Sequence, residues 1–338
     1  MRQPNFNNIL KVLNRQAPER PTLFELFLND SLYSDLCEQN ILDQKGELQW
    51  CKIIIHGFKN AGYDYASLQG SDFHFPVKQQ ARKQTISLNG DPMIFDEESF
   101  ASYMWLDPDN FDYSRLDKME SELPEGMKII VWGPGGVLEN VIGLVGYENL
   151  CIMIYENPNL VQKIFDGVGS GLARYYENCV KYPSVGAIIS NDDWGFKSQT
   201  MLSPADMRKY VFPWHKKIVG IAHKASMPVI LHSCGNLQQV MDDVIDDMKY
   251  DGKHSFEDNI LPVEEAYERW GHRIAILGGL DIDFMCRSTP EDIKARSLAM
   301  LERASKKGAY ALGTGNSVPE YIPRENYFAM TSTALSNT

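Results

Sequence analysis

The chain has 338 residues, of which 43% are hydrophobic and 23% are charged, a composition typical of a globular protein with a large core. Lys and Arg sum to 33 and Asp and Glu to 45, so the formal net charge is −12, and this acidic balance argues against nucleic acid as a partner. No apolar run has the length of a membrane span or signal peptide, and the six cysteines form no paired framework, so we expect a cytoplasmic protein with reduced thiols.

Short apolar segments alternate with stretches of helical periodicity along the chain. We predict strands at 20–26, 64–69, 128–132, 185–190, 229–232, 249–256, 273–277 and 309–312. Alternating strands and helices favour parallel pairing, and eight strands predict an α/β fold of the (β/α)8 TIM barrel type, with 1–338 as a single domain. An open, doubly wound sheet is the alternative.

A barrel of this type takes about 250 residues, so about 90 residues remain to be placed. We assign them to an N-terminal helical extension, 1–19, and to an insertion, 70–127, between the second and third predicted strands. The insertion is rich in aromatic residues. It is expected to form either a lid over the mouth of the barrel or an outer cover.

Two helices have clear starting signals. Ser203 and Thr289 each stand before a proline, and acidic residues follow in the first turn. Pro213 falls inside the first of these helices and is expected to kink or split it.

The most specific polar cluster follows the fifth predicted strand, where His232 and Cys234 stand two residues apart. Alternate side chains of an extended strand point to the same side, so we expect the imidazole and the thiol to face the same way. Zinc readily takes one nitrogen and one sulfur ligand from such a pair. The alternative is a buried histidine beside an unreactive core cysteine.

The sixth predicted strand ends in further candidate groups. Glu257 comes one helix and one strand after Cys234, so its carboxylate is expected at the neighbouring strand end as a third zinc ligand. The alternative is a helix cap formed by Glu257 and Asp258. His254 is a second candidate at this strand end, as a ligand or as a catalytic residue, although strand alternation points it away from the side of Glu257.

Two adjacent acids, Asp192 and Asp193, follow the fourth predicted strand. In a barrel the reactive groups stand at the carboxyl ends of the strands, so these residues are candidates for a general acid or base. Trp194 beside them is a candidate for orienting a substrate. The alternative is that both acids are solvated loop residues.

The eighth predicted strand is followed by a glycine-rich loop, 313–319. Its glycines allow the backbone to approach a ligand closely, or they simply form a turn. Thr314 and Asn316 in this loop are candidates for substrate contact.

Several of these motifs together resemble one known family. They are Asp-Trp-Gly at 193–195, Leu-Ser-Pro at 202–204, Pro-Trp at 213–214, Pro-Val-Ile-Leu-His-Ser-Cys-Gly at 228–235, Gly-Gly-Leu-Asp at 278–281, Gly-Thr-Gly-Asn-Ser-Val-Pro at 313–319 and Pro-Arg-Glu-Asn at 323–326. The pattern resembles the uroporphyrinogen decarboxylase family over roughly 185–330, and the N-terminal half matches it only faintly.

The resemblance implies one of two chemistries on one barrel. True uroporphyrinogen decarboxylases need no cofactor and carry an Arg-Gln-Ala-Gly-Arg motif near the N-terminus; the nearest stretch here, 15–20, departs from that motif and precedes the first predicted strand. The other branch comprises corrinoid-linked methyltransferases, which bind zinc through a His-x-Cys pair, and His232 and Cys234 match this pair. That branch also has a cysteine near the last strand, where this chain has Thr314. The more distantly similar cobalamin-independent methionine synthases add a glutamate, which Glu257 matches.

The sequence therefore predicts a zinc-dependent methyltransferase that uses a corrinoid on a partner protein and a small thiol or methylated substrate. The alternatives are decarboxylation of a porphyrinogen and a non-catalytic module that binds a corrinoid or porphyrin. By analogy with the family, a homodimer is expected.

Overall fold

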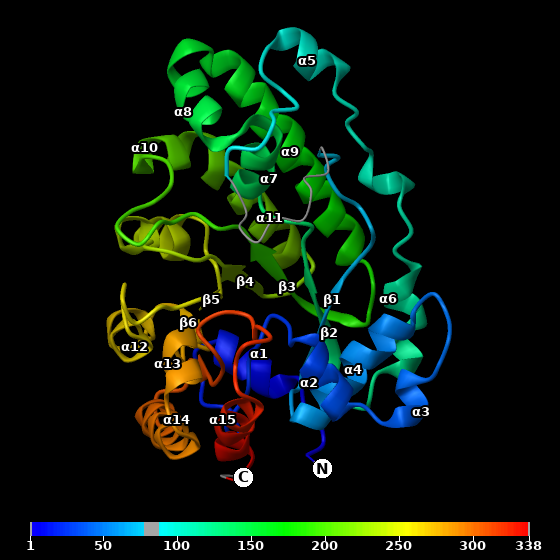
Figure 1. Ribbon diagram of the computed structural model, residues 1–338, viewed down its shortest axis with the longest axis vertical. Coiled ribbons are helices and arrows are strands. Elements are labelled where there is room, and N and C mark those ends of the chain that lie inside the picture. Colours follow the sequence, from blue (N-terminus) through cyan, green and yellow to red (C-terminus); the bar gives the residue numbers. More distant parts are fainter. Residues whose placement is uncertain (1, 78–87, 337–338) are drawn as a thin grey trace.

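Seven strands form one parallel sheet in the computed structural model, which describes residues 2–77 and 88–336. Each strand pairs with the next one in the chain, so the order across the sheet is the order in the sequence (Figure 1). The strands are β1 (Tyr65–Gln69), β2 (Lys128–Trp132), β3 (Val185–Asn191), β4 (Val229–His232), β5 (Gly252–His254), β6 (Ala275–Leu277) and β7 (Tyr310–Ala311).

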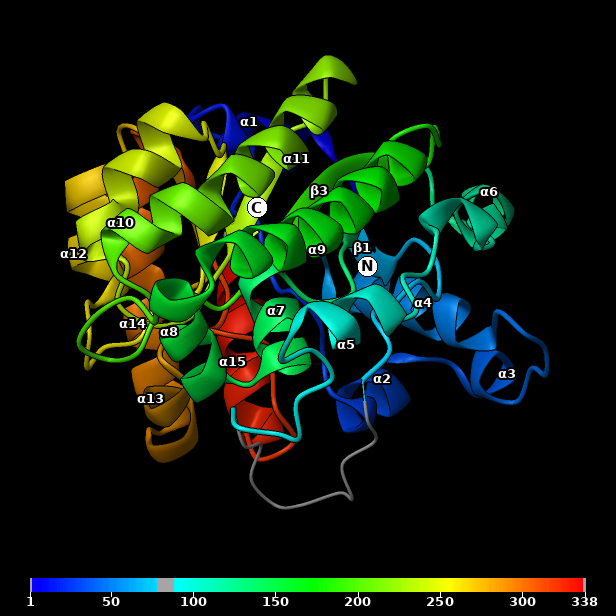
Figure 2. The same ribbon diagram turned by 90° about the horizontal axis from the view of Figure 1, so that it is seen from above.

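Helices surround this curled sheet. Those of the middle of the chain lie above the strands in Figure 1, those of the two ends lie below, and Figure 2 shows α9 and α11 side by side across the top. The α-helices are α1 (Asn7–Leu13), α2 (Asp30–Leu36), α3 (Gln39–Leu42), α4 (Gln49–Ala61), α5 (Glu97–Ser102), α6 (Ser114–Lys118), α7 (Val137–Val145), α8 (Tyr147–Glu156), α9 (Pro158–Cys179), α10 (Pro204–Asp206), α11 (Phe212–Lys224), α12 (Val263–Trp270), α13 (Ile282–Arg287), α14 (Pro290–Ala304) and α15 (Arg324–Ser336). Short 3-10 or π-helical segments are η1 (Pro108–Asn110), η2 (Glu120–Glu122), η3 (Met207–Val211), η4 (Gln238–Val240) and η5 (Asp243–Asp247).

The parallel α/β architecture agrees with the sequence, and seven of the eight predicted strands are present. The strand predicted at 20–26 is not confirmed, although two backbone hydrogen bonds join Thr22 and Phe24 to Leu312. Leu23 forms only an isolated parallel bridge to Leu312, beyond the end of β7. On the side of β1, the hydroxyl of Tyr65 accepts a hydrogen bond from the amide of Glu25 and donates one to its carbonyl oxygen. The Tyr65 side chain thus takes the two backbone groups of Glu25 that could otherwise pair with the backbone of β1. The result is a curled, TIM-barrel-like sheet of seven strands within the described residues.

The predicted helix signals are confirmed. The Ser203 hydroxyl accepts the amide of Asp206, and Thr289 and Asp292 form a capping box at the start of α14. Pro213 does divide its helix, because the π-helical segment η3 separates α10 from α11 just before it.

The long connection between β1 and β2, 70–127, contains α5, η1, α6 and η2. Part of it packs against α9 through glycines of that helix. A methyl group added at Gly167 would lie 2.5 Å from the Trp105 ring, and one at Gly171 would lie 3.0 Å from Phe75. The aromatic side chains of this segment therefore contribute to packing on α9.

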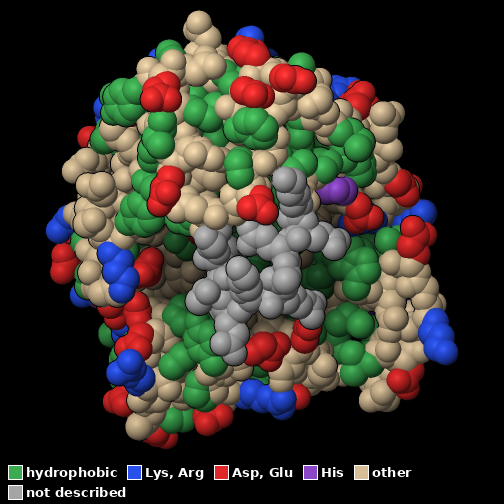
Figure 3. Space-filling view, turned by 45° about the horizontal axis from the view of Figure 1, so that its top comes forward, with side chains coloured by type: hydrophobic (Ala, Val, Ile, Leu, Met, Phe, Trp, Pro, Cys, Tyr) green, Lys and Arg blue, Asp and Glu red, His purple; other side chains and the backbone are tan. Residues whose placement is uncertain are grey.

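Within the described residues, no single helix is long and apolar enough to span a membrane, although the bent pair α7 and α8 passes that test together. On the face shown in Figure 3, the Lys and Arg side chains of the described residues lie singly and do not gather into a patch.

Candidate functional site

Three groups that commonly bind metals meet at the carboxyl ends of β3 and β4. Asp193, His232 and Cys234 each offer one ligand atom, and these atoms all lie within 4.8 Å of one another. His232 is the last residue of β4, and the other two residues stand in the loops after β3 and β4. We call these three residues the donor cluster.

The pairing of β3 with β4 brings the two loops together. Asn191 is in register with His232, so Asp193 and Cys234 each follow two residues after a paired position. The carboxylate of Asp193 accepts the amide of Cys234 at 2.8 Å. Gly235 has a φ of +85°, and a Cβ there would lie 2.1 Å from the Gly195 carbonyl oxygen, so this close contact between loops requires glycine.

A second histidine determines how His232 presents its ring. The two Nδ1 atoms of His232 and His254 lie 2.8 Å apart, and Nε2 of His254 lies 3.2 Å from the carbonyl oxygen of Thr314. That oxygen only accepts, so Nε2 of His254 carries a proton. Burial holds the pKa of His254 well below its usual range, so the ring is neutral and its Nδ1 accepts from Nδ1 of His232. The lone pair of His232 Nε2 is therefore free to bind a metal.

Hydrogen-bonding groups surround the Cys234 sulfur. The amide of Asn316 donates to it at 3.2 Å, and the Ser255 hydroxyl lies 3.7 Å away. Burial, followed by the charge of Asp193, raises the pKa of this thiol to about 12. Burial also lowers the pKa of His232 to about 4, which leaves its imidazole neutral and able to act as a ligand. A divalent cation would replace the thiol proton, and two anionic ligands would then balance its charge.

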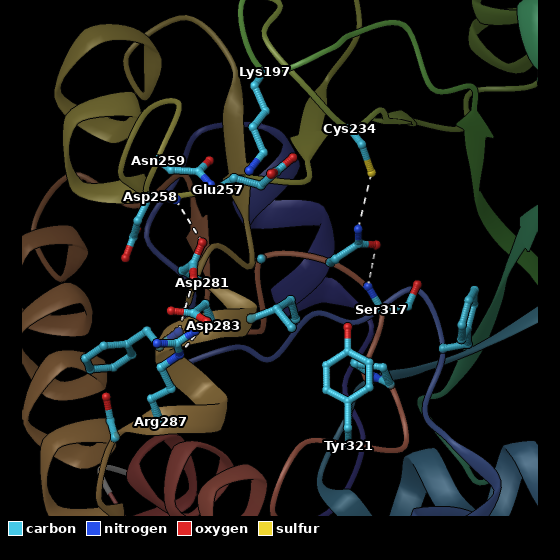
Figure 4. Close-up of a pocket in the computed structure, with 17 residues that line it drawn as sticks. Lys197, Cys234, Glu257, Asp258, Asn259, Asp281, Asp283, Arg287, Ser317 and Tyr321 are labelled. Carbon is cyan, nitrogen blue, oxygen red and sulfur yellow. Dashed lines mark hydrogen bonds and ion pairs between the residues drawn. The ribbon is translucent and has the colours of Figure 1, made fainter. Parts of the chain in front are cut away.

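The donor cluster borders a cleft of about 1070 Å³ at the carboxyl ends of the strands. Cys234 lines one wall, and the other residues come mainly from the loops after β5, β6 and β7 (Figure 4). Phe27 and Tyr321 supply aromatic surface. This is the position at which barrels of this kind carry their reactive groups.

The predicted ligand Glu257 lines the cleft but is not part of the donor cluster. β5 ends at His254 and the chain then turns, with the amide of Ile260 donating to the carbonyl oxygen of Glu257, so strand alternation does not extend to Glu257. In Figure 4 its carboxylate lies on the side of Lys197, whereas the Cys234 sulfur points to Asn316. The structure brings Asp193 to the predicted His-x-Cys pair in its place.

The two other candidates after β3 are in the interior. Both carboxylate oxygens of Asp192 are occupied, because they accept the amides of Leu138 and Glu139 at the start of α7, and one also lies 2.9 Å from Nε2 of His215. Trp194 is fully buried, with its ring 4.8 Å from that of His215. These contacts give Asp192 and Trp194 structural roles, so we do not retain them as catalytic or substrate-binding residues.

The two candidates after β7 differ from each other. Asn316 lines the cleft and donates to the Cys234 sulfur. This position is compatible with the predicted contact to a substrate. Thr314 is buried, and its amide and hydroxyl donate to the carboxylate of Glu25 at 2.6 and 2.8 Å. The side chain of Thr314 is therefore hydrogen-bonded to Glu25 and does not face the cleft. Its carbonyl oxygen lies next to Nε2 of His254, so Thr314 orients that histidine and does not contact a substrate.

Sequence reasoning missed the contact of Glu25 with Thr314, the burial of Lys253 and the position of Asp193 next to the His-x-Cys pair. For Asp193 a signal existed. Because β3 is a neighbour of β4 just as β5 is, a ligand for the His-x-Cys pair could come from the loop after β3 as well as from the loop after β5. For Glu25 there was none, since its partner Thr314 lies 289 residues away. Lys253 was read only as part of a strand.

The comparisons with known proteins agree on one family. The family model described as uroporphyrinogen decarboxylase (URO-D) matches residues 116–336. A uroporphyrinogen decarboxylase from Synechococcus sp. is 24% identical over 185 residues, which cover 53% of this chain and 49% of that protein. The enzyme from Geobacter sulfurreducens is 24% identical over 188 residues, or 56% and 52% of the two chains. The chain thus matches about half the length of these relatives.

Among solved structures, a methyltransferase from Methanosarcina mazei is similar over 97% of both chains, with a TM-score of 0.69 and 14% sequence identity. At that identity the likeness shows a shared fold. The match to the family model covers more than half of the sequence and includes the loops that carry the donor cluster. The chain belongs to the uroporphyrinogen decarboxylase family.

Proposed function

We propose that this protein is a zinc-dependent methyltransferase, in which Asp193, His232 and Cys234 hold the metal. The methyl group would move between a corrinoid on a partner protein and a small thiol or methylated substrate. The observation that carries the proposal is the donor cluster itself, with its ligand atoms within 4.8 Å of one another at the edge of a large cleft.

The donor set fits zinc, which takes nitrogen, sulfur and carboxylate oxygen and leaves a position open in catalytic sites. His232 presents a neutral imidazole whose orientation is fixed by His254. Asp193 is already hydrogen-bonded to the backbone of Cys234, so the carboxylate and the thiol are held together before a metal binds. When bound, the metal would act as a Lewis acid that keeps a substrate thiol deprotonated near neutral pH.

The residues of the chain itself would position the reactants. The Asn316 amide, which donates to the Cys234 sulfur, limits how far negative charge accumulates on that ligand. Phe27 and Tyr321, which are 40% and 71% exposed, supply aromatic surface in the cleft against which the methyl group would pack. In the thiol-methylating direction, a corrinoid on the partner protein would supply the methyl group and take up the electron pair of the bond that breaks, and the substrate thiolate would supply the electron pair of the new carbon–sulfur bond.

Zinc analysis of the purified protein tests this ligand set. We expect about one zinc per chain in the wild type, and loss of zinc in Asp193→Asn, His232→Gln and Cys234→Ser. Glu257→Gln is the matched control, because Glu257 is a carboxylate of the same cleft outside the donor cluster, and it should retain the metal. A zinc-free wild type, or a zinc-free Glu257→Gln beside a loaded Asp193→Asn, would contradict the proposed site.

Porphyrinogen decarboxylation is the second candidate, because the curated relatives named above are uroporphyrinogen decarboxylases. The charge of the cleft argues against it. Four carboxylates line the cleft, Glu257, Asp258, Asp281 and Asp283, against the two cations Lys197 and Arg287. Arg287 is already paired with Asp283, so a substrate with several carboxylates meets little positive charge among the described residues.

The two candidates are separated by offering each substrate to the same protein sample. Conversion of methylcobalamin and 2-mercaptoethanol to a thioether, with no release of carbon dioxide from uroporphyrinogen, supports the methyltransferase. Decarboxylation without methyl transfer supports the second candidate. Binding of the corrinoid with neither reaction indicates a non-catalytic module.

A further inference from the structure

A buried lysine lies directly behind the donor cluster and has no role in the reaction described above. Lys253 is the middle residue of β5 and is only 3% exposed. Its ammonium donates to the carbonyl oxygen of Ser233 at 3.1 Å and also to that of Ser255. The ammonium lies 4.4 Å from the centre of the Phe256 ring.

The two carbonyl acceptors belong to the two loops that shape the donor cluster. Ser233 stands between the proposed ligands His232 and Cys234, so its carbonyl oxygen fixes the backbone of the His-x-Cys pair. Ser255 follows His254, and its hydroxyl lies 3.7 Å from the Cys234 sulfur. One ammonium group therefore links the loop after β4 to the loop after β5.

The energetic cost of this arrangement indicates a role beyond packing. Taking an ammonium group out of water is expensive unless it is paired, and no carboxylate in residues 2–77 or 88–336 forms an ion pair with Lys253. A methionine would fill similar space without that cost. Burial lowers the pKa of Lys253 to about 8, and the charges of Cys234, Asp193 and Glu257 act in the opposite direction. The negative groups that offset the buried cation are those of the proposed metal site and its cleft.

We propose that Lys253 is a positioning residue for the metal site, which holds the His-x-Cys pair in its ligating geometry and supplies positive charge next to the Cys234 thiolate. This inference rests on the proposed function, because it assumes that the donor cluster binds a metal. Lys253 itself touches neither the metal nor the substrate.

The test compares metal binding in Lys253→Met with that in Lys128→Met. Lys128 is a matched control, because its ammonium also donates to a backbone carbonyl oxygen, that of Pro183 at 2.7 Å, but at the amino end of β2. For Lys253→Met we expect zinc affinity to fall by about 10- to 100-fold, the range typical of groups that support metal ligands. After loading with Co²⁺, the thiolate-to-cobalt absorption band should weaken or shift in this variant. Lys128→Met should keep the wild-type affinity and spectrum.

A second variant covers the case in which Lys253→Met does not fold. Lys253→Gln keeps an NH2 group that can donate to a carbonyl oxygen but carries no charge, and we expect a loss of zinc affinity by about tenfold. A folded Lys253→Met or Lys253→Gln with the zinc affinity and cobalt spectrum of the wild type would overturn the role of Lys253 and leave the metal site intact. A wild type that binds neither metal would overturn the proposed function and this inference with it.

Discussion

Two polar networks begin at adjacent residues after β3, and they differ in one respect that decides their roles. Asp192 enters a sealed network with His215, whose Nδ1 lies 2.7 Å from the hydroxyl of Tyr250 and 3.0 Å from that of Ser190. Asp193 turns the other way, toward His232 and Cys234 at the cleft. In the Asp192 network the acid, histidine, serine and tyrosine are all at most 3% exposed, and their hydrogen bonds are made within the protein.

The comparison shows that an acid–histidine pair alone does not identify a reactive site. Ser190, His215 and Asp192 have the residue types of a hydrolytic triad, but the substrate would have no path to the buried serine. The Asp193 cluster combines a free imidazole nitrogen, a thiol and a carboxylate with access to a large cleft. Metal-binding atoms next to a cleft, rather than the residue types, distinguish the candidate functional network from the structural one.

The largest effect is expected from removing the sulfur ligand. Cys234→Ala should lower methyl transfer by on the order of a thousandfold, because losing the metal removes several kcal/mol of transition-state stabilisation. Thermal unfolding of the metal-free variant should match that of the metal-free wild type. The rate of methylcobalamin consumption in the presence of a thiol checks this, and near-normal turnover would show that the cleft works without the donor cluster.

The sealed network should show the opposite behaviour. In Asp192→Asn an amide replaces a carboxylate that accepts two backbone amides and faces His215, so we expect the free energy of unfolding to fall by about 3 kcal/mol. Zinc binding at saturating metal should persist in the folded fraction. Urea unfolding followed by zinc titration checks both points. A variant of normal stability that no longer binds zinc would place Asp192 in the site.

The support given by His254 can be measured separately from the ligands. His254→Phe keeps a ring but removes both nitrogens, so His232 loses the partner of its Nδ1, and we expect zinc affinity to fall by about 10- to 100-fold. His223→Phe is the control, since His223 contacts Asp251 at the surface, and it should bind zinc normally. Equal zinc affinities in the two variants would show that His254 does not support His232 as a metal ligand.

A pH-dependent effect is expected at Glu25, whose carboxyl group binds Thr314 beneath the cleft. Burial raises its pKa to about 8, whereas the pKa of an unfolded glutamate is about 4.3. Between these values the folded state keeps a proton that the unfolded state has released, so the free energy of unfolding falls as the pH rises. Glu25→Gln removes this term, and its stability relative to the wild type should rise with pH by up to about 1.4 kcal/mol per unit between pH 5 and pH 8.

Denaturant unfolding at several pH values checks this expectation, with the exposed Glu98→Gln as a control. Parallel pH profiles for Glu25→Gln and the wild type would show that Glu25 is already ionised in the folded protein.

The sequence predicted most of the fold because local patterns determine it. The strands of a parallel sheet are buried on both faces, so β2 and β4 read as apolar runs and were placed at their correct boundaries. The segment 20–26 also carries apolar residues, but the backbone amide and carbonyl oxygen of Glu25 are hydrogen-bonded to the side chain of Tyr65, 40 residues away, and not to the backbone of β1. The local sequence of 20–26 does not predict a contact between residues so far apart in the chain.

The candidate site divides in the same way. His232 and Cys234 were found because strand alternation is a local rule. Glu257 was chosen because it follows one helix and one strand after Cys234, but β5 ends at His254 and the chain turns at Glu257, outside the donor cluster. Thr314 looked accessible in a glycine-rich loop, and only the fold shows that Glu25 holds it below the cleft.

The central claim is that one metal ion binds a nitrogen, a sulfur and a carboxylate from two neighbouring strand ends. X-ray absorption at the zinc edge of the loaded protein tests it most directly. The account predicts one sulfur neighbour at about 2.3 Å, with the remaining nitrogen and oxygen neighbours at about 2.0 to 2.2 Å, and loss of the sulfur signal in Cys234→Ser. A zinc environment of nitrogen and oxygen alone, identical in the wild type and in Cys234→Ser, would contradict it.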